Sequence, residues 1–133
     1  MVLPALILSS IQCFGQEVKQ EVKKEEPKTF RDLFTEGAYH LEFKSYNLAL
    51  TVYLQMEKME PDNANIFYRI GLCYINLPNE KSKAIPYLEK AVKSATNNYD
   101  DLAYTERNAP LISYFELAKA YHLNGQIDTA ISN

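Results

Sequence analysis

The stretch IFYRIGLCYINL, residues 66–77, decides the fold class of this chain. Its large apolar residues recur every three or four positions, a spacing that predicts an amphipathic helix. These residues are Phe67, Ile70, Tyr74 and Leu77. Gly71 lies in the middle of this helix, where a glycine costs about 1 kcal/mol relative to alanine. A small residue at this cost indicates that another part of the chain packs closely against the helix.

A second glycine, Gly37, lies 34 residues before Gly71, and the positions around the two glycines repeat as well. Leu33, Leu41, Ala49 and Tyr53 correspond to Phe67, Ile75, Ala84 and Leu88, with one residue inserted in the second copy. A third copy contains Tyr114, Leu117, Ala118, Tyr121, Gly125 and Ala130. Self-similarity at this period predicts a stack of similar helical units.

These copies resemble the tetratricopeptide repeat, a helix–turn–helix unit with small residues at two positions and large apolar residues around them. The second copy matches with Phe67, Ile70, Gly71, Tyr74, Ala84, Leu88 and Ala91. The first copy matches with Leu33, Gly37, Ala49, Tyr53 and Pro61. It departs from the family pattern at Glu36, His40 and Met56. Within each pair we expect the small residues to meet, so that Gly71 lies against Ala84.

The expected fold is an all-α tetratricopeptide-repeat solenoid of about two and a half repeats, over residues 30–62, 63–96 and an incomplete 110–133. The expected helices span residues 30–43, 46–60, 63–76, 81–95 and 110–124, and a last helix begins near Ile127. Pro110 would lie in the first turn of its helix, where its missing N–H is harmless. Residues 96–108 interrupt the period as a long ordered loop, which is either functional or a surface detour held by Tyr99 and Tyr104.

The N-terminus has a different composition from the repeats. Residues 2–14 are uncharged and mostly apolar, but too few to span a bilayer as a helix. Residues 1–15 therefore resemble a secretory signal peptide, cut before Gln16, although no basic residue precedes the apolar run. A true start codon upstream of Met1 would explain the missing basic residue. The alternative to a signal peptide is a buried N-terminal helix. Residues 16–29 are charged and nearly balanced, which predicts a flexible linker.

Composition and motifs argue against catalysis. The chain has 133 residues and a net charge of −3, so it has no basic footprint for nucleic acid. It has two histidines and two cysteines, in no metal-ligand or nucleophile motif. Cys73 is expected to be a small buried residue rather than a reactive thiolate. We therefore predict that the protein is not an enzyme and has no cofactor, metal site or small-molecule substrate.

Without catalysis, the expected function is the binding of a partner in the concave groove of the solenoid. Repeat register predicts that certain positions of the first helix in each repeat face this groove, where they would hold a peptide or a partner helix. These residues are Arg31, Phe34, Asn65, Tyr68, Asn76, Ile112, Phe115, Lys119 and His122. The expected partner is a protein or peptide, and the chain would not span a membrane once the signal peptide is removed.

Two segments resemble a narrower group, the N-terminal repeats of OmpA-family envelope proteins of the Bacteroidetes. These segments are NIFYRIGLCYINLPNEKSKAIPYLEKAV and AYTERNAPLISYFELAKAYHLNGQIDTAI. In that group the repeats precede a β-propeller and an OmpA-like peptidoglycan-binding domain. The resemblance implies a periplasmic scaffold, associated with the outer membrane and linked to gliding motility or outer-membrane protein secretion.

Several alternatives stay open at this point. The array could be a structural spacer with no ligand of its own, or a cytosolic helical regulator that retains residues 1–15. The third repeat stops early, which suggests a fragment of a longer protein or a partner that supplies the missing helix.

Overall fold

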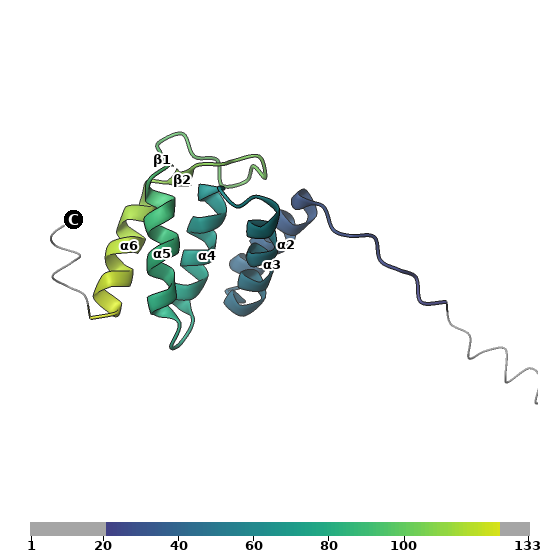
Figure 1. Cartoon of the computed structure of the whole chain (residues 1–133), viewed down its shortest axis with the longest axis horizontal. Helices are drawn as coiled ribbons and strands as arrows, with labels where there is room; N and C mark the ends of the chain where they lie inside the picture. Colours follow the sequence, from purple (N-terminus) through teal and green to yellow (C-terminus); the bar gives the residue numbers. More distant parts are fainter. Residues whose placement is uncertain (1–20, 126–133) are drawn as a thin grey trace, which may run out of the picture.

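The computed structural model describes residues 21–125, and these residues form an all-α solenoid (Figure 1). Its helices are α2 (Phe30–Glu42), α3 (Tyr46–Met59), α4 (Ala64–Asn76), α5 (Lys81–Val92) and α6 (Ile112–Leu123). Two short strands, β1 (Ala95–Thr96) and β2 (Ala109–Pro110), pair in parallel. Residues 21–29 are exposed and have no regular secondary structure. The predicted signal peptide and the helix expected near Ile127 lie outside the described residues.

Side-chain caps mark the start of the first helix in each of the first two repeats. Thr29 and Asp32 form a capping box at the start of α2, in which each side chain accepts a hydrogen bond from the other residue's backbone N–H. At the start of α4, the Asn63 side chain accepts from the N–H groups of Asn65 and Ile66. Asn63 is therefore the cap of α4, one residue before its first helical turn.

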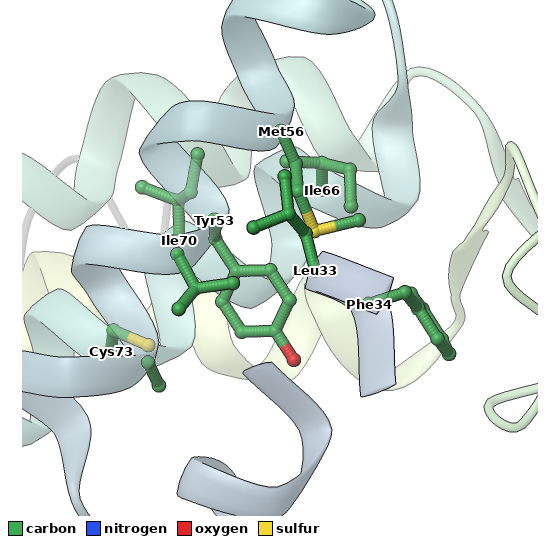
Figure 2. Close-up of a cluster of buried hydrophobic side chains, with 9 residues drawn as sticks. Leu33, Phe34, Tyr53, Met56, Ile66, Ile70 and Cys73 are labelled. Carbon is green, nitrogen blue, oxygen red and sulfur yellow. The ribbon is translucent and has the colours of Figure 1, made fainter. Parts of the chain in front are cut away.

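The core is built from contacts between helices that are consecutive along the chain. Figure 2 shows the largest cluster, in which Tyr53 and Met56 of α3 pack between Leu33 of α2 and Ile70 of α4. A second cluster joins α4, α5 and α6 through Ile75, Ala84, Leu88 and Ala120. Most helix contacts join neighbours along the chain, as expected of a solenoid.

The side chain nearest to Gly71 is Leu88, one helical turn after the predicted Ala84. A Cβ added at Gly71 would lie 2.6 Å from Cγ of Leu88, and all three of its nearest atoms belong to Leu88. In the first repeat, a Cβ on Gly37 would lie 2.7 Å from Cζ of the Tyr53 ring. The glycine therefore makes room for a large side chain of the second helix. Leu88 and Tyr53 are both fully buried, and that burial offsets the helix cost of the glycine.

The region between the second and third repeats differs from the prediction. The helix expected over residues 81–95 ends at Val92, and the one expected over 110–124 begins at Ile112. Pro110 lies in β2 rather than in the first turn of a helix. The two strands bring Ala95 opposite Ala109, and this pairing closes the base of a loop over residues 97–108, hereafter the inter-repeat loop.

Candidate protein-binding groove

A hollow of about 1000 Å³ lies on the face formed by α2, α4 and the inter-repeat loop. We call it the groove. Helix α2 provides Phe34, Thr35, Ala38, Tyr39, Leu41 and Glu42, and α4 provides Tyr68, Arg69 and Leu72. The far wall consists of Tyr99, Asp101, Leu102, Pro110 and Ile112. Aromatic and aliphatic groups dominate this lining, as in most sites that bind peptides or ligands.

The inter-repeat loop is organised around Glu106. Its carboxylate accepts hydrogen bonds from the backbone N–H groups of Asp100 (3.1 Å), Arg107 (3.0 Å) and Asn108 (2.8 Å). These bonds stabilise the ionised form, so the pKa of Glu106 is lowered. A charged side chain therefore gives this irregular segment a defined shape.

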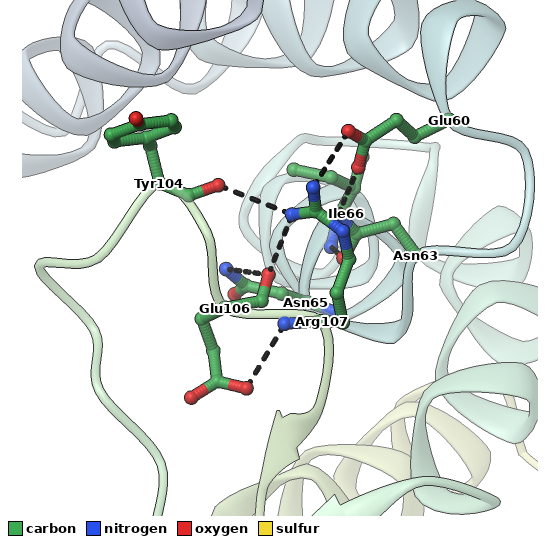
Figure 3. A network of polar contacts seen from close by, with 7 residues as sticks. All are labelled: Glu60, Asn63, Asn65, Ile66, Tyr104, Glu106 and Arg107. Carbon is green, nitrogen blue, oxygen red and sulfur yellow. Dashed lines mark hydrogen bonds and ion pairs between the residues drawn. The ribbon is translucent and has the colours of Figure 1, made fainter.

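Arg107 attaches the loop to the repeats (Figure 3). Its guanidinium forms an ion pair with Glu60 at 2.8 Å and lies 5.4 Å from the centre of the Phe30 ring. Its backbone C=O accepts a hydrogen bond from the N–H of Ala64, the first residue of α4. Arg31 adds a further contact, since its guanidinium lies 5.6 Å from the centre of the Tyr104 ring. The loop therefore spans from the α5–α6 side to the start of α2 and borders one end of the groove.

Arg69 is the polar centre of the groove wall, and its side chain is 6% exposed. Its Nε donates to Asn65 Oδ1 (3.0 Å) and its Nη1 to the Tyr53 hydroxyl (3.2 Å). Its Nη2 donates to the Tyr99 hydroxyl (3.2 Å) and to the C=O of Asp101 (2.7 Å). Among the described residues, Arg69 has no carboxylate within ion-pair distance. Neutral acceptors therefore hold a buried charge, an arrangement that fixes the loop to α4.

Tyr53 and Tyr68 are neutral at physiological pH. Burial raises the pKa of Tyr53 to about 12, despite the opposing effect of Arg69. Burial also raises the pKa of Tyr68 to about 12, and the nearby Tyr99, Glu116 and Asp101 add to the shift. Each hydroxyl can therefore donate one hydrogen bond and accept others.

The structure places three of the nine predicted groove residues in the lining, namely Phe34, Tyr68 and Ile112. Phe34 is buried and lies beneath the Arg69 guanidinium, at 4.7 Å from the ring centre. Asn65 is fully buried, and its side chain bonds to Arg69 and Tyr99. Asn65 supports the groove wall and is not available for a ligand.

The remaining predicted residues lie outside the lining. Arg31 contacts Tyr104 of the inter-repeat loop, and Asn76 donates to the C=O of Leu72 in its own helix. Phe115 is 65% exposed on α6, where His122 is also exposed. Lys119 forms an ion pair with Glu116 at 3.5 Å. Of the four predicted positions on α6, Ile112 at its start lies in the lining and the other three do not.

Reasoning from the repeat pattern missed Arg69 and the residues of the loop wall. The repeat register assigns position 69 neither to the packed interior nor to the groove, and the available signal was a charged residue in an otherwise apolar stretch. Tyr99 was expected only to hold the inserted segment, and Asp101 had no signal, because both belong to an insertion outside the repeat. In the third copy, Tyr121 is 8% exposed, and its hydroxyl donates a hydrogen bond to Glu89 of α5.

Other chemical features of the described residues are few. Cys73 is buried, as predicted, and burial raises the pKa of its thiol to about 12. Between residues 21 and 125 there is no cluster of three or more metal-ligating side chains. No helix in the same range combines the length and apolar character needed to cross a membrane.

Stacked helical pairs define the class of the protein, an α-helical repeat protein. Within it, residues 64–98 match the family model described as Tetratricopeptide repeat. The match covers α4, α5 and β1, so the chain contains a repeat of this family, and such repeats generally mediate protein–protein interaction. Neither the curated proteins nor the solved structures include a match. The narrower resemblance to OmpA-family envelope proteins has no support from these comparisons.

Proposed function

We propose that this protein is a non-catalytic scaffold that holds a peptide segment or helix of a partner protein in the groove. The observation that carries the proposal is a hollow of about 1000 Å³ with a mainly apolar and aromatic lining on α2 and α4, the second of which belongs to the repeat that matches the tetratricopeptide family. The loop wall of the groove is preformed, because Arg69 and Arg107 hold the inter-repeat loop in place. A preformed wall lowers the entropy cost of binding.

Selection from a phage-displayed library of random dodecapeptides on the full chain tests this proposal. Selected peptides should lose binding to Thr35→Arg, which places a long charged side chain in the groove from an exposed position. They should bind Tyr39→Ala about tenfold more weakly, because Tyr39 is 59% exposed and lines the groove.

Phe115→Ala is the matched control, since Phe115 is an exposed aromatic residue outside the groove lining. Equal loss of binding in all three variants would show that the groove is not the binding surface. If no peptide is selected, the structural-spacer alternative is favoured.

For the cellular setting, we propose an exported, periplasmic protein with a role in the envelope, in association with the outer membrane and linked to gliding motility or outer-membrane protein secretion. Support comes from the uncharged apolar residues 2–14 and from the resemblance of the repeats to envelope proteins. Intact-mass measurement on the protein from its native source tests the export step. A mass that begins at Gln16 is expected, and a mass that includes residues 1–15 would contradict it.

A further inference from the structure

The backbone of the groove offers little to an extended peptide. Its residues from α2 and α4 lie within regular helices, where N–H and C=O groups bond to each other along the helix. On the loop wall, the C=O of Asp101 accepts a hydrogen bond from Arg69. The N–H of Leu102 donates to Oδ1 of Asp100, and Pro110 has no N–H. Extended peptides commonly bind to a row of unpaired backbone groups, and the described residues of the groove present no such row.

The polar side chains of the groove are also mostly occupied. Among the described residues, the lining contains no asparagine or glutamine, the side chains that offer a strong donor and an acceptor together. Thr35 donates its hydroxyl proton to the C=O of Arg31 in its own helix, at 3.0 Å. Arg69 is 6% exposed and donates to four acceptors within the protein. A partner that satisfies its own backbone hydrogen bonds therefore suits this lining better than one that needs them from the groove.

The apolar residues of the groove follow helical spacing on both inner helices. On α2, Phe34, Ala38 and Leu41 are separated by four and three residues. On α4, Tyr68 and Leu72 are four residues apart. Such residues form rows along a helix, about 10 Å long from Phe34 to Leu41, and a further helix can pack between two rows. Ala38 is the small residue in the middle of the α2 row, where a partner helix can approach closely.

The charge of the groove restricts the partner further. Glu42 and Asp101 are exposed in the lining, and neither forms an ion pair with another described residue. Arg69, the one cation among the described lining residues, is buried over the Phe34 ring and bonded internally. A partner therefore meets negative charge at the edges of an apolar surface, which disfavours acidic residues beside its own apolar face.

We propose that the groove receives an amphipathic helix of the partner protein rather than an extended peptide. The apolar stripe of this helix packs against the rows on α2 and α4, and no acidic residue lies along the edges of the stripe. This inference rests on the proposed function, because it specifies the conformation and the chemistry of the segment that the groove holds. The partner helix makes its own backbone hydrogen bonds, so the groove contributes apolar burial and shape rather than backbone pairing.

The test uses the dodecapeptides selected on the full chain. We expect their consensus to place apolar residues at i, at i+3 or i+4, and at i+7. A lactam bridge between positions i and i+4 on the opposite face, which favours the helix before binding, should strengthen binding about tenfold in fluorescence anisotropy. The uncyclised peptide of the same sequence is the matched control. An extended bound conformation predicts weaker binding of the bridged peptide, because the bridge prevents extension.

A proline substitution provides a second measurement. It is placed at a central position of the peptide where alanine changes the affinity less than twofold. Proline there should weaken binding about hundredfold, because it removes a helical hydrogen bond and clashes with the preceding turn. The ¹³C chemical shifts of a labelled peptide should change from disordered to helical values when the protein is added.

The charge of the groove is tested on the same peptides. A glutamate placed at one edge of the apolar stripe should weaken binding about threefold, and the double variant Glu42→Gln, Asp101→Asn should abolish that penalty. Asp62→Asn removes a charge at an exposed position outside the groove lining, and it should leave the penalty unchanged. A penalty that persists in the double variant would contradict the assigned charge of the partner helix.

The outcomes distinguish the two proposals. Peptides that bind in the groove, as judged by Thr35→Arg, but keep extended chemical shifts and lose affinity on bridging would overturn this inference and leave the proposed function intact. Tolerance of the central proline would overturn it equally. If no selected peptide is sensitive to Thr35→Arg, the proposed function fails and this inference fails with it.

Discussion

The helical hairpins and the inter-repeat loop are stabilised in different ways. In the hairpins, Gly37 and Gly71 admit Tyr53 and Leu88, and the stability comes from buried apolar surface. In the loop, Leu102 is 86% exposed. The loop is held by the hydrogen bond from Arg69 to the C=O of Asp101, by the internal hydrogen bonds to Glu106, and by the ion pair between Arg107 and Glu60.

The helical hairpins and the inter-repeat loop should therefore tolerate substitutions differently. Apolar packing at fully buried positions leaves no space for added atoms, so one methyl group disturbs it. Polar contacts at a partly exposed loop can be exchanged for water at a lower cost. The hairpins should therefore determine global stability, while the loop determines the shape of the groove.

The largest effect is expected from Gly71→Val. The first added carbon would already lie 2.6 Å from Leu88 Cγ, so the two helices must separate. We expect the free energy of unfolding to fall by about 3 kcal/mol or more, measured by urea denaturation. Gln55→Val, at an exposed position of α3, is the control and should cost less than about 1 kcal/mol.

A second change tests the cause of that loss. Leu88→Ala in the Gly71→Val background reopens the space, so the double variant should lose less than the sum of the single variants. Strict additivity would show that Gly71 and Leu88 do not interact and would contradict the packing described here.

An intermediate effect is expected from Arg69→Met, because Arg69 belongs to both regions. The replacement keeps an apolar stem but removes the donors to Tyr53, Tyr99 and the C=O of Asp101. We expect a loss of about 2–3 kcal/mol and faster hydrogen exchange of the loop amides, with helix content unchanged by circular dichroism. Unchanged exchange in the loop would mean that Arg69 does not hold it.

The smallest effect is expected from Arg107→Gln, which removes the ion pair with Glu60 and the contact with Phe30. The Arg107 side chain is 50% exposed, so the loss of stability should be about 0.5–1 kcal/mol. Limited proteolysis should nevertheless cut the loop sooner than in the unmodified protein. A loss as large as that of Gly71→Val would show that the loop contributes to the core.

The fold could be predicted because each repeat places apolar residues at helical spacing, and Gly37 and Gly71 mark the same point in two copies. The partner of the glycine could not be predicted from its size alone. A small residue leaves space, and whether Ala84 or Leu88 enters that space depends on how the two helices are offset along their axes.

The site was predicted less completely than the fold, for a related reason. Phe34, Tyr68 and Ile112 were found because they occupy repeat positions on the inner helices. Asn65 was assigned to the groove by the same register, but the tertiary structure covers it with the loop. Tyr99 and Asp101 follow no period, so their positions depend on contacts with distant residues.

By itself the sequence determined an all-α stack, the places where most of its helices begin, and the burial of Cys73, because helical periodicity and capping depend on residues close along the chain. Only the tertiary structure decided which side chain fills the space beside each glycine and which residues line the groove. Those outcomes depend on long-range contacts, above all the hydrogen bonds from Arg69 to a loop some 30 residues further along. Local sequence does not encode such contacts, because their geometry is established only when the helices have packed.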